Sequence, residues 1–179
     1  VFGLLAALFL QTMYGAVDMM IVGRFSQASE VSAVSTGSWI MQTITTAIVG
    51  LSMGTTILLG RRIGEKQPEE AGRVAGAGIW LFAWIGIVVT VVMQFLAVPA
   101  AGWMRAPMEA FDSTASYVRI CSAGAVFIVA YNVMGSIFRG LGNSRIPLIS
   151  VSIACLVNIA GDLLLVGALG MASAGAAIA

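Results

Sequence analysis

The chain has 179 residues, of which 59% are hydrophobic and 9% charged, and its formal net charge is +1. Average soluble domains carry roughly 25% charged residues, so a water-soluble fold of this length would lack the polar side chains that cover a surface. The nine basic residues are scattered and form no patch, which argues against nucleic acid as a partner. The segment contains no histidine, which excludes histidine-based zinc sites and Ser-His-Asp triads within it.

Charged residues divide the chain into apolar stretches that are long enough to cross a membrane. A spanning helix needs about 20 mostly apolar residues, because the hydrocarbon core is about 30 Å thick and each residue rises about 1.5 Å. We therefore expect an all-α, polytopic membrane helix bundle, a single transmembrane domain over residues 1–179. Its five complete helices and a truncated sixth are expected at about residues 1–23, 31–60, 74–104, 113–138, 146–169 and 172–179. Because the chain opens and closes within apolar sequence, we expect it to be a piece of a longer protein.

Short polar connectors separate these stretches and carry signals for helix starts. In the second connector, residues 61–73, Pro68 is followed by two acidic residues, a pattern that suits the first turn of a helix. In the fourth, Asn143 or Ser144 can cap a helix that we expect to open at Pro147.

The basic residues of the connectors predict the orientation in the membrane, because cytoplasmic loops are enriched in lysine and arginine. The first and third connectors hold only Arg24 and Arg105. The second and fourth connectors together hold six basic residues: Arg61, Arg62, Lys66, Arg73, Arg139 and Arg145. We therefore expect the second and fourth connectors, and with them the N-terminus, to lie in the cytoplasm.

Two aspartates, Asp18 and Asp162, interrupt the apolar stretches. An acid at the centre of a bilayer costs about 2.5 to 3.5 kcal/mol on the insertion scale, so each needs a reason to be there. Asp18 precedes Arg24 by six residues, which places it about 9 Å below the outer boundary. Asp162 follows Pro147 by fifteen residues, which places it about 8 Å below the same boundary. Two carboxyl groups at matching depth are what a shared site requires.

Each acid has an amide on its own helical face. Gln11 precedes Asp18 by two turns, and Asn158 precedes Asp162 by one turn. Carboxylate and amide oxygens can bind a hard cation such as Na⁺, and a carboxylate in this setting can also carry a proton. We therefore take Asp18, Asn158 and Asp162 as a candidate cation site with Gln11 in support; the alternative is that these groups only hydrogen-bond between helices.

Other residues have a weaker functional signal. Tyr131 and Asn132 in the fourth stretch are candidates for a supporting polar role, although such side chains also join helices in membranes. Several glycines are expected to allow close helix packing, namely Gly50, Gly54, Gly76 and Gly78.

Five segments of the chain, in order and correctly spaced, are similar to the multidrug and toxic compound extrusion (MATE) family. They are QTMYGAVDMMIVGR, GLSMGTTILLGRRIGEKQ, FRGLGNSRIPL, NIAGDLLLV and GAAIA. The resemblance covers essentially the whole chain. It implies twelve helices in two six-helix lobes around a central cleft, with this chain as the N-terminal lobe and a C-terminal lobe as its partner.

The resemblance also implies which residues bind the coupling ion. The family's first-helix aspartate and its fifth-helix Asn-x-x-x-Asp pair match Asp18, Asn158 and Asp162, and the preceding glutamine matches Gln11. A sixth-helix threonine would follow GAAIA. One departure is Asn143, where members of the family often have aspartate.

By this resemblance the expected function is secondary active transport in the plasma (inner) membrane. The protein would export lipophilic or cationic organic compounds in exchange for Na⁺ or H⁺, without a cofactor and without enzymatic activity. One alternative is a lipid-linked sugar flippase of the same superfamily, for which Arg119 is the only basic residue inside a stretch. An intramembrane protease built on Asp18 and Asp162 and a scaffold without transport are the others.

Overall fold

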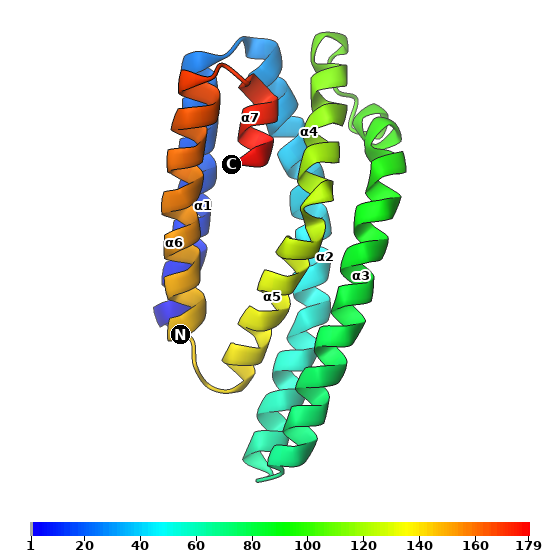
Figure 1. Cartoon of the computed structure of the whole chain (residues 1–179), viewed down its shortest axis with the longest axis vertical. Coiled ribbons are helices and arrows are strands. Elements are labelled where there is room, and N and C mark those ends of the chain that lie inside the picture. The colour runs from blue at the N-terminus through cyan, green and yellow to red at the C-terminus, as the bar shows by residue number, and fades with distance from the viewer. Residues whose placement is uncertain (1) are drawn as a thin grey trace.

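The computed structural model describes the backbone of residues 2–179, and the side chains of 1–8, 10–12 and 14 lie outside the described part. The described backbone is helical, with short connections (Figure 1). The helices are α1 (Phe2–Phe25), α2 (Ala28–Gly64), α3 (Pro68–Trp103), α4 (Phe111–Ala123), α5 (Ala125–Gly140), α6 (Arg145–Asp162) and α7 (Ala172–Ile178). A 3-10 turn at Met108–Ala110 precedes α4, and a π-helix at Leu163–Ala168 follows α6.

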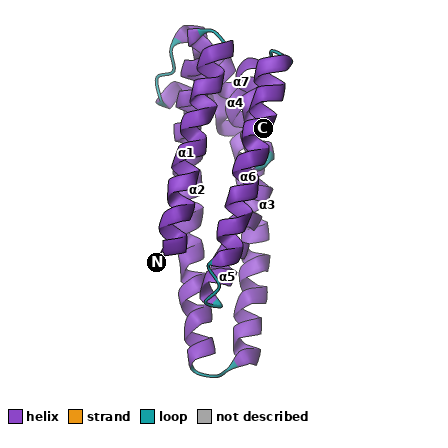
Figure 2. Ribbon diagram, turned by 90° about the vertical axis from the view of Figure 1, so that its left-hand side faces the viewer, coloured by secondary structure: helices purple, strands orange, loops and turns teal. Residues whose placement is uncertain are grey.

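The helices form two groups that run roughly along one axis. In the first, α5 packs against both α2 and α3, and α4 continues the contact toward the other end of the same pair. In the second, α1 packs along α6, as Figures 1 and 2 show from two directions. The short α7 joins the groups, since it contacts both α4 and α2 on one side and α6 on the other.

Among the described residues, several helices are candidates for crossing a membrane. Three are by themselves long and apolar enough to do so: Ala28–Gly64, Pro68–Trp103 and Arg145–Ala168. The pair Met108–Ala123 and Ala125–Gly140, bent by 51° at its break, makes a fourth if it is one span. The multi-helix membrane fold is thus as expected, whereas the count of five complete helices plus the start of a sixth stays a prediction.

The fourth apolar stretch differs from the single helix expected at 113–138. The helix breaks at Gly124, whose amide donates to the carbonyl of Cys121 at 3.1 Å. The Gln94 amide of α3 donates to the Arg119 carbonyl at 3.0 Å and lies 3.4 Å from the Ser122 hydroxyl. The Arg119 carbonyl, five residues before the break, therefore has a donor from a neighbouring helix, and such donors allow a bend within apolar surroundings.

Helices α3 and α6 begin close to the positions expected from the connector sequences. Helix α3 starts at Pro68. Proline suits this position because the amide of a first helical residue has no intrahelical acceptor, so no hydrogen bond is lost. Helix α6 starts at Arg145 rather than Pro147, and the side chain of Asn143 accepts hydrogen bonds from the amides of Arg145 (3.1 Å) and Ile146 (3.4 Å). Asn143 therefore caps this helix, while Ser144 makes no capping bond.

The prediction that four glycines allow close helix packing holds for one of them. A Cβ on Gly78 would lie 3.1 Å from the Thr55 methyl group, so α2 and α3 approach closely there. At Gly50, Gly54 and Gly76 a Cβ would meet no atom within 4 Å, and the prediction was wrong for these three.

Candidate functional site

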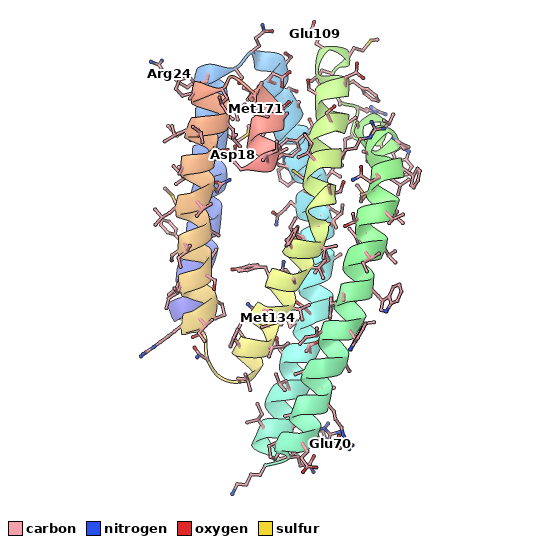
Figure 3. All side chains as sticks on the ribbon, in the orientation of Figure 1. Asp18, Arg24, Glu70, Glu109, Met134 and Met171 are labelled. Atoms are coloured by element: carbon pink, nitrogen blue, oxygen red, sulfur yellow. The ribbon has the colours of Figure 1, made fainter. Side chains whose placement is uncertain are left out.

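Asp18 and Asp162 meet between α1 and α6. Asp18 lies in the second half of α1, and Asp162 is the last residue of α6, fully buried at 0% exposure. Their carboxyl groups are close enough for one, when protonated, to donate a hydrogen bond to the other. Figure 3 shows Asp18 in the upper part of the α1–α6 pair, below the connector that leads into α7. The structure thus brings together the two acids that the sequence placed at the same depth.

Four oxygen atoms of this site have no hydrogen-bond donor among the described residues. Asp18 Oδ1, Asn158 Oδ1 and both carboxylate oxygens of Asp162 are buried and accept no hydrogen bond from the described side chains and backbone. More than nine in ten buried polar groups in proteins have a partner, and an orphan costs about 1 to 3 kcal/mol. Four such atoms lie in one region, and carboxylate and amide oxygens of this kind can accept a proton or bind a hard cation such as Na⁺.

Asp162 is also the point where the helix changes its geometry. The π-helix Leu163–Ala168 follows directly, and the Leu169 amide bonds the Leu164 carbonyl at 2.9 Å, five residues back. Single π turns inside α-helices are frequent at functional sites. Next to Asp162, a Cβ on Gly161 would lie 3.0 Å from the Ala179 side chain, so the end of α7 packs closely beside the acid pair.

Helix α4 supplies neighbours of the acids that the sequence did not reveal. Tyr117 and Cys121, one turn apart, lie within electrostatic range of Asp18. The Tyr117 hydroxyl and the Ser38 hydroxyl share a hydrogen bond of 3.1 Å, and the Cys121 thiol lies 3.8 Å from the Ala177 carbonyl. Tyrosine and cysteine in an apolar stretch look like ordinary core residues, so no signal in the sequence pointed to this role.

The supporting candidates contribute less. The side chain of Gln11 lies outside the described residues. Asn132 donates to the Ile128 carbonyl of its own helix at 2.8 Å, and Tyr131 is 43% exposed. In the described part of the chain, neither Asn132 nor Tyr131 is hydrogen-bonded to the acid pair.

Outside the candidate site, the side chain of Glu30 in α2 forms hydrogen bonds to both α4 and α7. One carboxylate oxygen accepts a hydrogen bond from the Ser113 hydroxyl of α4 (2.8 Å), and the other accepts one from the Ser173 amide of α7 (3.1 Å). Partial burial raises the pKa of Glu30, but the hydrogen bonds from Ser173 and Ser113 outweigh it, so the pKa lies below its ordinary value. Glu30 therefore fixes α7, which packs beside the acids.

Comparison with known proteins identifies the fold and this arrangement of helices. The model of the MatE family matches residues 4–164, most of the chain. The chain belongs to the MatE family. It is similar to the "Probable multidrug resistance protein YoeA" of Bacillus subtilis, with 29% identity over 151 residues, which is 84% of the chain and 33% of that protein. It is also 23% identical over 150 residues to the "Probable multidrug resistance protein NorM" of Thermotoga maritima, covering 84% of the chain and 32% of the relative.

Solved structures of MATE proteins agree with this assignment. A multidrug resistance MATE family transporter of the MOP superfamily in an outward-facing conformation superimposes with a TM-score of 0.91 at 28% identity, over 98% of this chain and 39% of that one. A MOP superfamily transporter from Pyrococcus furiosus, described as having a binding pocket of reversed polarity, gives 0.91 and 28% over the same shares. The chain thus spans about a third of the length of these curated MATE relatives and about two fifths of the solved structures.

Family membership settles the broad class of the protein. The chain therefore belongs to a family of multi-pass membrane transporters, and this family is not one of enzymes. The intramembrane protease considered from the sequence is thereby set aside.

Proposed function

We propose that the chain is the N-terminal lobe of an antiporter that exports lipophilic or cationic organic compounds in exchange for Na⁺ or H⁺. The observation that carries the proposal is the pair Asp18 and Asp162: Asp162 is fully buried, and Asp18 Oδ1 and both Asp162 oxygens have no donors among the described residues. The names of the relatives, which are multidrug resistance proteins, support the substrate class.

The ion acts by changing the charge between two helices. Without a cation the two carboxylates repel each other across the α1–α6 contact, and in partly desolvated surroundings such repulsion amounts to a few kcal/mol. A Na⁺ ion bound by Asp18, Asp162 and Asn158, or a proton shared by the acids, removes this repulsion and favours the packed arrangement. An ion shifts a conformational equilibrium only by its different affinity for the two states, so the acids are expected to be more hydrated in the state that releases the ion.

Helix α1 is suited to respond to the charge of the pair. It packs mainly against α6, with smaller contacts to α2, α7 and the π-helix. A change in the α1–α6 contact can therefore move α1 without repacking the α2–α3–α5 group. Because substrate and ion would favour different positions of α1, binding of one promotes release of the other.

The test is transport by the full-length protein in proteoliposomes, with Na⁺ and pH gradients imposed separately. We expect ion-driven efflux to fall at least about tenfold in Asp18→Asn and in Asp162→Asn, the effect of losing about 1.4 kcal/mol of coupling. Asp112→Asn, at an exposed acid outside the site, is the control and should transport normally. Undiminished ion-driven efflux in both site variants would show that the acids do not couple transport, and the gradient that drives the wild type identifies the ion.

The alternative function is that of a lipid-linked sugar flippase, for which a different experimental result is expected. Such a cargo carries a pyrophosphate that needs basic side chains in the cleft, whereas Arg119, the basic residue inside the fourth stretch, is exposed. Binding of a lipid-linked pyrophosphate by the full-length protein, together with absence of drug efflux, would favour the flippase.

A further inference from the structure

The seam between α2 and α3 contains an apolar groove of about 530 Å³. Its walls come from these two helices alone, with Leu51 and Leu58 on α2 and Leu81 and Ile85 on α3. The three leucines are 42% to 62% exposed among the described atoms, although each is a large apolar side chain. The groove is separate from the acid pair, which lies between α1 and α6.

Gly54 leaves space in the groove. A Cβ on Gly54 would meet no atom within 4 Å, whereas one on Gly78 would lie 3.1 Å from the Thr55 side chain, where α2 and α3 approach closely. Both glycines line the groove. A helix pair that merely needed close packing would bring these glycines together, but here the space beside Gly54 is left open.

Among the described residues, Arg73 is the only charged one that lines the groove. The residues lining α3 extend from Arg73 to Ile85, twelve positions and therefore about 18 Å along the helix axis. Half of the hydrocarbon core of a bilayer is about 15 Å thick. The groove therefore matches one leaflet in length, with a guanidinium group at the level where lipid headgroups lie.

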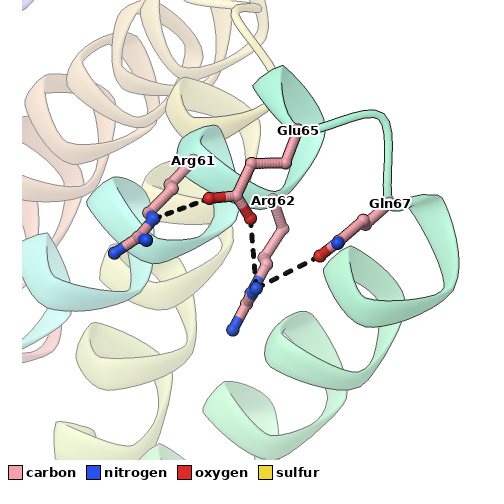
Figure 4. Close-up of polar contacts among 4 residues, drawn as sticks. All are labelled: Arg61, Arg62, Glu65 and Gln67. Carbon is pink, nitrogen blue, oxygen red and sulfur yellow. Dashed lines mark hydrogen bonds and ion pairs between the residues drawn. The ribbon is translucent and has the colours of Figure 1, made fainter.

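The surroundings of Arg73 favour an anionic headgroup. The adjoining α2–α3 connector also holds Arg61, Arg62 and Lys66. Arg61 and Arg62 both form ion pairs with Glu65 (Figure 4). Arg73 forms an exposed ion pair with Glu70 at 3.1 Å. Exposed pairs of this kind contribute about 0 to 1 kcal/mol, so the Arg73 guanidinium can turn to a phosphate, to which it can bond through two nitrogens.

We propose that the groove binds one anionic glycerophospholipid of the leaflet that adjoins the α2–α3 connector. An acyl chain lies along Gly54 and Gly78, and the phosphate of the headgroup contacts Arg73. If that connector is cytoplasmic, as its basic residues indicate, the ligand comes from the inner leaflet, where anionic lipids attract basic segments next to the membrane. This site is independent of the proposed antiport.

Native mass spectrometry of the full-length protein from vesicles of equal phosphatidylglycerol and phosphatidylcholine content tests the proposal. We expect the wild type to retain phosphatidylglycerol preferentially. Arg73→Gln should weaken that retention about fivefold, the effect of one basic residue at a membrane surface, and leave phosphatidylcholine unchanged. Gly54→Leu should fill the groove and lower the retention of both lipids.

Matched controls separate a specific site from general effects. Arg61→Gln removes an arginine that also pairs with a nearby glutamate, Glu65, but does not line the groove. Gly50→Leu adds the same side chain one turn away, where a Cβ likewise meets nothing within 4 Å. Both controls should retain lipid as the wild type does, and thermal unfolding should show all four variants folded.

Three results would overturn the lipid site. The first is equal retention of the two lipids by the wild type, and the second is equal loss in the Arg73→Gln and Arg61→Gln proteins. The third comes from a photoreactive benzoylphenylalanine in place of Leu58, which should capture lipid. Capture of the C-terminal lobe or of a second copy instead would show that protein covers the groove.

Discussion

Tyr117 approaches the backbone of α2 at a place where residue 37 has no side chain. A Cβ on Gly37 would overlap the Cδ1 atom of the Tyr117 ring, and the same ring is 7% exposed and hydrogen-bonded to Ser38. Gly37→Ala is therefore expected to destabilise the full-length protein by about 1 to 3 kcal/mol, the usual effect of overpacking, despite the better helix propensity of alanine. Thermal unfolding in detergent measures the change.

Gly50→Ala is the matched control, since Gly50 lies in the same helix with no atom within 4 Å of a Cβ. There alanine should be neutral or stabilising by up to about 1 kcal/mol. Equal stability of the two variants would mean that Tyr117 does not pack against Gly37 in the full-length protein.

At the level of single residues, the sequence predicted the acids but not their surroundings. Asp18 and Asp162 were identifiable because an acid in an apolar stretch is expensive, and their depths follow from counting along a helix. Tyr117 and Cys121 approach Asp18 only because α4 packs against α2 and α7. Such a contact between distant segments leaves no periodic pattern in one sequence.

At the level of helices, Glu30 makes the joint between α2, α4 and α7 sensitive to acid. Its hydrogen bonds from Ser173 and Ser113 outweigh partial burial and hold its pKa below the ordinary value of 4.5. An acid whose pKa is lower in the folded than in the unfolded state stabilises the protein at pH values above its unfolded-state pKa. This stabilisation is lost as the pH falls through the folded-state pKa. We therefore expect the stability to fall below pH 4.5, by a small amount because solvent screens the charge of this partly exposed group.

Glu30→Gln separates this effect from the titration of other acids. The variant keeps one acceptor oxygen but has no charge to lose, so it should be less stable than the wild type at pH 7 and equally stable at acid pH. Unfolding curves of both full-length proteins across this range give the difference. A constant difference at every pH would show that folding does not lower the pKa of Glu30.

The break between α4 and α5 and the π-helix after α6 show why helix geometry was harder to predict than helix position. Hydropathy places apolar stretches but does not distinguish a straight helix from a bent one. Beside the bend at Gly124, Gln94 of α3 bonds groups that are 25 residues or more away in the chain. Residues 163–168, which form the π-helix, likewise contact the distant α1.

For the molecule as a whole, the two helix groups keep the proposed ion site apart from the proposed lipid groove. The α2–α3–α5 group shares one core, which includes Ile48, Phe82 and Val129. The α1–α6 pair holds the acids and reaches the rest through α7 and a second core around Val22 and Tyr117. A change of charge therefore acts on the smaller group, while the larger one offers a stable surface to lipid.

Orientation in the membrane is a property of the whole molecule, and α2 allows a direct test. Its 37 residues, Ala28–Gly64, extend about 55 Å, so the exposed Gln27 and Lys66 at its two ends lie on opposite sides of a hydrocarbon core of about 30 Å. In full-length protein without its native cysteines, a membrane-impermeant maleimide added to intact cells should label Gln27→Cys and spare Lys66→Cys until the membrane is opened, because the connectors rich in arginine and lysine stay in the cytoplasm. Labelling of Lys66→Cys alone in intact cells would reverse the orientation, and labelling of both would contradict α2 as a membrane span.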